Sequence, residues 1–83
     1  MSITKKALLV LLTISDRNNY SAKIAKETKM AKSQIYETLK DFKKLEIVRV
    51  IHTNNKRIYF ELTDKGKKIQ EILMVIKYVT LIK

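Results

Sequence analysis

The 83-residue chain has no cysteine, no proline and no tryptophan, and it contains one glycine and one histidine. Without cysteine it has neither a disulfide framework nor a thiolate metal site. The scarcity of glycine and proline excludes collagen-like and linker sequences, and a hydrophobic content of 46% excludes intrinsic disorder. Because so short a chain buries only about 60% of its unfolded surface, we expect a single domain over residues 1–83 that needs tight packing or a second subunit.

The residues needed for catalysis are also scarce. His52 is the lone histidine, and three aspartates, Asp16, Asp41 and Asp64, fall on different predicted elements. Gly66 alone cannot form a glycine-rich phosphate loop. We therefore expect no enzymatic activity, no metal, no cofactor and no small-molecule ligand. His52, near a predicted hairpin tip, is expected to be an ordinary surface histidine, with pH sensing or a phosphate contact as the alternative.

Negative charge is sparse: the chain has 18 Lys and Arg residues but only 8 Asp and Glu residues, and its formal net charge is +10. Such a field attracts polyanions, so double-stranded DNA is the first expected partner, ahead of an acidic membrane surface; a role in solubility alone is the remaining alternative. The apolar runs lack a cleavage site and are too short to span a bilayer. We expect a cytoplasmic protein without membrane association, at the nucleoid or, if viral, in a host cell.

Apolar spacing predicts three helices in the first half of the chain, over residues 3–15, 21–28 and 32–45. Ser21 is the expected N-cap of the second helix. In the third, Ile35, Leu39 and Phe42 recur about one turn apart and form the expected buried stripe. Two short helices joined by the tight turn at residues 28–30 make a helix-turn-helix.

After Glu46 the apolar period changes from 3.6 to 2, which predicts a β-hairpin over residues 47–62. A three-residue loop with Thr53 facing Arg57 would place Val48, Val50 and His52 on one face with Ile58, Phe60 and Leu62. A loop with an even number of residues would put Arg49 on the face of Phe60, so the apolar pattern favours the odd loop.

Thr63 is the expected cap of a last helix over residues 64–82, which is apolar around most of its circumference. A domain of this size cannot bury such a helix alone, so we expect a homodimer. The predicted interface comprises Leu8, Leu12, Ile72, Val75, Ile76, Val79 and Ile82.

The stretch SAKIAKETKMAKSQIYETLKDFKKLEIVRV resembles the helix-turn-helix of MarR-type winged-helix regulators, and YFELTDKGKK is similar to the Leu-Thr-x-x-Gly signature that ends their wing. The resemblance covers roughly residues 5–68. It implies a mainly α fold with a small β-hairpin, a winged helix-turn-helix with a long C-terminal dimerisation helix. Two positions depart from the family pattern: Glu46 replaces the usual glycine after the recognition helix, and Ala31 replaces a capping Ser or Thr.

The resemblance implies sequence-specific DNA binding by a homodimeric transcriptional regulator, with the third helix in the major groove and the wing on the flanking backbone or minor groove. Expected recognition-helix contacts are Lys32, Ser33, Gln34, Tyr36, Glu37 and Lys40. Glu37 accepts from cytosine or, as an alternative, pairs with Lys40 within the helix. Expected wing contacts are Asn54, Asn55, Lys56 and Arg57, and expected backbone contacts are Ser21, Lys23, Lys26 and Lys29. Three other classes stay open: an architectural DNA-coating protein, a protein-interaction module and, more remotely, a membrane-surface protein.

Overall fold

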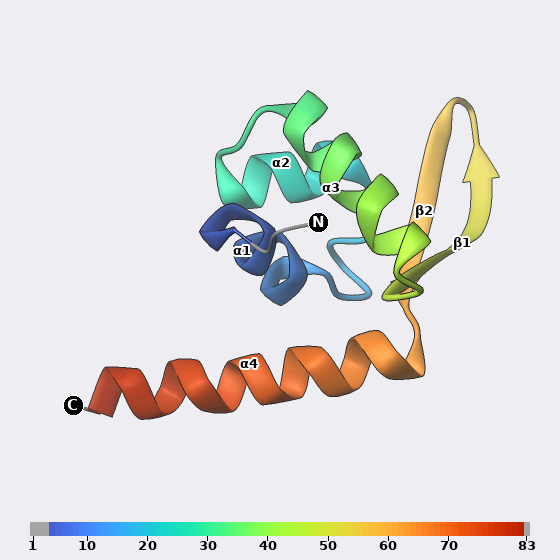
Figure 1. Ribbon diagram of the computed structural model, residues 1–83. Helices are drawn as coiled ribbons and strands as arrows, with labels where there is room; N and C mark the ends of the chain where they lie inside the picture. Colours follow the sequence, from blue (N-terminus) through green and yellow to red (C-terminus); the bar gives the residue numbers. More distant parts are fainter. Residues whose placement is uncertain (1–3, 83) are drawn as a thin grey trace.

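The computed structural model describes residues 4–82, with side chains as far as residue 78, as four helices and one two-stranded antiparallel hairpin (Figure 1). The three short helices pack around one another, the hairpin stands beside α3, and α4 runs past α1 at the base of the view in Figure 1. This order confirms the expected mainly helical winged-helix fold. The elements are α1 (Lys5–Thr13), α2 (Ser21–Thr28), α3 (Lys32–Lys44), β1 (Val48–Asn54), β2 (Arg57–Leu62) and α4 (Asp64–Ile82).

The first helix is shorter than the expected range of residues 3–15. Thr4 caps it, because its hydroxyl accepts the Ala7 N–H at 3.1 Å. The helix ends at Thr13 because Ile14 turns to extended backbone, with φ −62° and ψ 125°. The Ile14 side chain is nevertheless buried, so the chain leaves the helix while still packed on the core. Residue 3, where the prediction began, lies outside the described residues.

Helices α2 and α3 form the centre of the fold. Ile24 of α2 and Ile35 and Leu39 of α3 are almost completely buried, as the apolar spacing predicted. The prediction that Ser21 caps α2 is wrong: Ser21 is the first helical residue, and extended Tyr20 occupies the cap position without a side-chain bond. The turn between the helices passes through Lys29 in the left-handed conformation.

The hairpin follows the expected register at its base and departs from it near the tip. Val48 pairs with Leu62 and Val50 with Phe60, but a bulge between Val50 and His52 shifts the pairing by one residue. His52 therefore pairs with Tyr59 rather than sharing a face with Ile58, and the expected three-residue loop is wrong. The loop has two residues, Asn55 and Lys56, both with positive φ. Such a turn matches the right-handed twist of the two strands. The bulge in β1 accommodates the one residue that the shorter loop leaves over.

The end of α3 forms the tight left-handed cap despite the missing glycine. Glu46 has φ 61°, and its N–H donates to the Lys43 carbonyl at 3.1 Å. The Ile47 N–H donates to the Phe42 carbonyl at 2.8 Å. These two bonds define a Schellman motif. Leu45 therefore caps α3, which ends at Lys44, and the strand begins at Val48 rather than at residue 47.

We expect Glu46→Gly to stabilise the protein by about 1 kcal/mol. A side chain in the left-handed conformation costs about 1–2 kcal/mol, and part of the gain is offset by the greater freedom of glycine in the unfolded chain. Urea denaturation at matched protein concentration measures the difference. Glu46→Ala is the control, because it removes the carboxylate but keeps the backbone cost. If alanine stabilised as much as glycine, the carboxylate and not the backbone would be responsible.

Thr63 joins the hairpin, the end of α3 and the start of α4. Its hydroxyl accepts the Gly66 N–H at 3.1 Å, which confirms the predicted cap, and it donates to the Glu46 carbonyl. Further along α4, the Gln70 amide donates to the Leu11 and Ile14 carbonyls at the end of α1, at 2.8 and 2.9 Å. These contacts fix the first half of α4 against the body. No helix within residues 4–82 is both long enough and apolar enough to cross a membrane.

Candidate nucleic-acid interface

The buried stripe of α3 determines which side chains it presents outward. Ile35, Leu39 and Phe42 face the core, and at 100° per residue Ser33, Glu37 and Lys40 lie on the opposite side. The other predicted recognition residues fall on the two flanks. Lys32 and Tyr36 turn toward the wing, and Gln34 turns toward α1, where Ser33 and Glu37 also line the hollow between the two helices. The structure therefore distributes the six predicted residues over three directions instead of one face.

A groove of about 370 Å³ separates α3 from the hairpin tip. Lys32 and Tyr36 line it from α3, Ser21 lines it from the start of α2, and Lys56 and Arg57 line it from the hairpin tip. None of the residues that line this groove is acidic. The groove thus brings together three cationic side chains from two elements far apart in the sequence.

The wing tip places the four predicted wing residues in sequence around the turn. Asn54 ends β1, Asn55 and Lys56 form the turn, and Arg57 opens β2, with all four exposed. Lys56 has φ 70°, which disfavours a lysine. Glycine would fit this position better, so the lysine carries a conformational cost there.

Arg57 rests on an aromatic cluster that the sequence prediction did not identify. Its guanidinium carbon lies 4.2 Å from the centroid of the Tyr20 ring, and its Nη1 donates to the Tyr59 hydroxyl at 3.5 Å. The Tyr20 and Tyr59 rings meet edge to face at 5.4 Å, and the His52 ring lies 4.6 Å from Tyr59. The hydrogen bond to Tyr59, followed by interaction with Tyr20, raises the pKa of Arg57 above its ordinary value.

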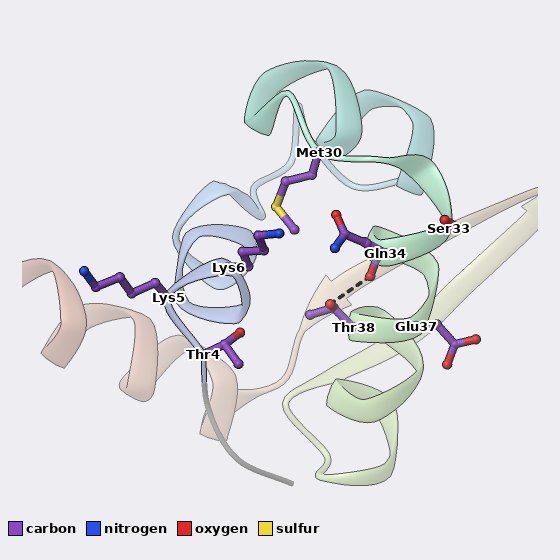
Figure 2. A pocket seen from close by; sticks show the side chains of 8 residues that line it. All are labelled: Thr4, Lys5, Lys6, Met30, Ser33, Gln34, Glu37 and Thr38. Atoms are coloured by element: carbon purple, nitrogen blue, oxygen red, sulfur yellow. Dashed lines mark hydrogen bonds between the residues drawn. The ribbon is translucent and has the colours of Figure 1, made fainter.

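A second, shallow hollow of about 640 Å³ lies on the other flank of α3, against the start of α1 (Figure 2). Figure 2 shows the Gln34 side chain pointing from α3 toward Met30, with Lys6 extending from α1 into the same space, whereas Glu37 points away from α1. Lys5 and Lys6 were not among the predicted site residues. Because α1 lies far from α3 in the sequence, no local pattern links them.

The remaining predicted DNA contacts lie outside both hollows. Lys26, Lys29 and Lys40 are exposed, and Lys23 is half-buried on α2. The ion pair found within the described residues joins Arg49 and Glu61 across the hairpin, so Glu37 and Lys40 do not form the pair that was considered for them. The described residues also contain no group of His, Cys, Asp or Glu side chains able to hold a metal ion.

The predicted dimer residues differ in exposure. Leu8 and Leu12 on α1 are half-buried, whereas Ile72 and Val75 on α4 are 59% and 62% exposed. Ile76 is also exposed, as are Met74 and Tyr78, which the prediction left out. Ile69 and Leu73 are the α4 residues that pack on the core instead. The side chains of Val79 and Ile82 lie outside the described residues.

No protein-family model matches the sequence, and no curated protein matches it significantly. Solved structures do resemble it. The zinc-responsive MarR family member ZitR of Lactococcus lactis has a TM-score of 0.81 and 17% identity over 98% of this chain and 58% of that one. The adhesin competence repressor AdcR of Streptococcus pyogenes has a TM-score of 0.84 and 20% identity over 96% of this chain and 60% of that one.

FabT of Streptococcus pneumoniae, solved in complex with DNA, has a TM-score of 0.82 and 13% identity over 96% of this chain and 58% of that one. The chain spans less than two thirds of the length of each of these three proteins. At these identities the shared property is the arrangement of helices and wing. The chain has the winged-helix fold of MarR-like regulators.

Proposed function

We propose that the chain binds double-stranded DNA in a sequence-specific manner as a homodimeric transcriptional regulator. The observation that carries this proposal is the acid-free groove between the recognition helix and the wing, where Lys32, Lys56 and Arg57 converge beside an exposed helix face. A net charge of +10 adds long-range attraction for a polyanion. FabT, one of the similar structures, is itself a complex with DNA.

In this proposal α3 enters the major groove with its N-terminal half toward the bases. An α-helix with side chains is about 10–12 Å wide, which matches the groove. Ser33, Glu37 and Lys40 point straight at the groove floor, because they lie opposite the buried stripe. Tyr36 and Gln34, on opposite flanks, reach toward different strands; the tyrosine ring suits a thymine methyl, and the amide suits adenine.

The wing and α2 hold the backbone on either side of α3. Lys56 and Arg57 at the wing tip reach the flanking phosphates or minor groove, with Asn54 and Asn55 beside them. Lys32 and Arg57 line the same protein groove, the one between α3 and the wing, so both act on one stretch of the DNA backbone. Backbone contacts fix the position of the protein on DNA but carry no base information. We assign that role to Ser21, Lys23, Lys26 and Lys29.

In this proposal a second copy of the chain completes the DNA-binding unit. The apolar side chains of Ile72, Val75 and Tyr78 on α4 extend the hydrophobic surface beyond the body of the domain. Burial of this surface against a twofold mate places two recognition helices on successive major-groove faces. Half-site centres then lie about 34–36 Å apart, and the operator is a near-palindrome.

The test selects bound duplexes from a random DNA pool and measures affinity for the winner and for bulk DNA at two salt concentrations. We expect an enriched inverted repeat, bound about 10³-fold more tightly than bulk DNA. Tyr36→Ala is expected to weaken operator binding by roughly tenfold and leave bulk binding unchanged, because it removes a base contact. Lys26→Gln, the matched variant at an exposed position assigned to the backbone, is expected to weaken both and to lower the salt slope by about one.

Two outcomes contradict the proposal in different ways. Salt-sensitive binding with no enriched motif means that the protein coats DNA through phosphate contacts alone. If the chain does not bind DNA at moderate salt, the remaining function for the fold is interaction with another protein. Equal effects of Tyr36→Ala on operator and bulk DNA would remove the base-reading role of that residue.

A further inference from the structure

The guanidinium of Arg57 contacts two tyrosine side chains of its own chain. The guanidinium carbon lies over the Tyr20 ring, 4.2 Å from its centroid, and Nη1 donates to the Tyr59 hydroxyl at 3.5 Å. Stacking uses the π-face of a guanidinium, whereas phosphate binding uses the in-plane N–H donors. The bond to Tyr59 uses one of the five N–H donors of an arginine, so most of the donors of Arg57 stay free at the groove that it shares with Lys32.

The position of Tyr20 is itself fixed by the backbone. The Phe60 N–H of β2 donates to the Asn19 carbonyl at 2.8 Å, so the segment before α2 lies alongside the wing. Tyr20 is extended there, with φ −141° and ψ 156°. Edge-to-face contact with Tyr59 at 5.4 Å orients its ring. The ring is therefore a fixed support between the body of the domain and the wing.

An arginine that is free in solution samples many rotamers, and only the fraction in the correct one is ready to bind. The apparent dissociation constant rises as that fraction falls. Ordering a long side chain at the moment of binding is one of the ordinary costs of association. A support that orders Arg57 beforehand removes that cost without touching the DNA.

We propose that Tyr20 is the positioning residue for the wing arginine, and that it raises DNA affinity by holding the guanidinium of Arg57 at the groove between the wing and the recognition helix. This inference rests on the proposed function. Tyr59 assists by accepting one N–H and by fixing the Tyr20 ring. The tight turn at Asn55 and Lys56 keeps the arginine at the start of β2, within reach of both rings.

The test is a double-mutant cycle on operator affinity with Tyr20→Leu and Arg57→Gln in the full chain. We expect Tyr20→Leu to weaken binding by about three- to tenfold when Arg57 is present, because ordering of the arginine is lost. In the Arg57→Gln background the same change is expected to alter affinity by less than twofold. Tyr20→Phe, the matched control, keeps the ring and should bind like the native chain. Tyr20→Met gives the same pattern as leucine and replaces it if leucine reduces the folded fraction.

Several results would overturn the inference. An equal loss from Tyr20→Leu in both backgrounds means that Tyr20 acts on the fold and not through Arg57. Tighter binding by Tyr20→Leu means that Arg57 must leave the ring to reach DNA. Failure of the proposed function looks different, because the native chain then shows no enriched operator at all. If the native chain selects an operator and Arg57→Gln weakens it while the coupling is absent, only the role of Tyr20 is lost.

Discussion

Gly66→Ala is expected to destabilise the protein by about 2 kcal/mol, although alanine is normally the better helix former. A Cβ at this position would lie 2.1 Å from the Ile47 carbonyl oxygen and 3.2 Å from Leu62 Cδ2. Overpacking costs about 1–3 kcal/mol and occasionally more, and a collision with backbone belongs at the upper end. Alanine has a higher helix propensity than glycine, but this offsets only about 1 kcal/mol of the destabilisation.

The carbonyl that Gly66 approaches cannot move aside easily. It accepts the Thr63 N–H at 3.0 Å and lies 3.1 Å from the Thr63 hydroxyl, which in turn accepts the Gly66 N–H. Any displacement of Ile47 therefore breaks the junction between the wing and α4. A loss of about 2 kcal/mol is a large share of the roughly 5–15 kcal/mol that stabilises an ordinary domain.

Equilibrium denaturation by urea checks this prediction, with Lys68→Ala as the control. Lys68 is exposed in the same turn of α4, so its replacement should change stability by less than about 0.5 kcal/mol. Gly66→Ser should be destabilised like Gly66→Ala, because both carry the Cβ that meets Ile47. A Gly66→Ala variant as stable as the native chain would show that the helix and the strand separate at little cost.

The features that the sequence predicts correctly are those that depend on local periodicity. Ile35, Leu39 and Phe42 recur at helical spacing, and the structure buries all three. Thr63 precedes an apolar helical pattern and caps it. Such features need no knowledge of distant parts of the chain, since spacing and capping are set within one or two turns.

Competing local preferences, together with contacts between distant segments, account for the features that the sequence did not predict. The hairpin tip slips by one residue because the demands of a two-residue turn outweigh the apolar alternation, and periodicity alone cannot weigh the two. Tyr20 supports Arg57 across 37 positions of sequence, through a backbone bond from Phe60 to Asn19. The left-handed turn at Glu46 forms without glycine because the bonds to Phe42 and Lys43 compensate its cost.

Val75→Glu is expected to convert the proposed dimer to a monomer and to weaken operator binding by about 100-fold. Val75 is 62% exposed on the outer side of α4, between Ile72 and Tyr78, which are 59% and 66% exposed. Removing such a surface from water favours association by about 25 cal/mol for each Å² of apolar area, and a carboxylate at its centre reverses the balance. A monomer binds only one half-site. It loses the high effective concentration that a second, linked DNA-binding domain has for the other half-site.

Sedimentation and operator titration of the same variants separate dimer loss from a change in charge. Val75→Glu lowers the net positive charge, and this change by itself weakens DNA binding. Val75→Lys is therefore the decisive control variant. It raises the net charge but still places an ion in the apolar surface. We expect both variants to sediment as monomers and to lose operator affinity, while Val75→Ile stays dimeric and binds like the native chain. Binding to a single half-site should be nearly unchanged in Val75→Ile and slightly stronger in Val75→Lys. If Val75→Lys sedimented as a dimer with native operator affinity, the outer face of α4 would not be the dimer interface. The next surface to substitute would then be two other exposed leucines, Leu9 of α1 and Leu45 directly after α3.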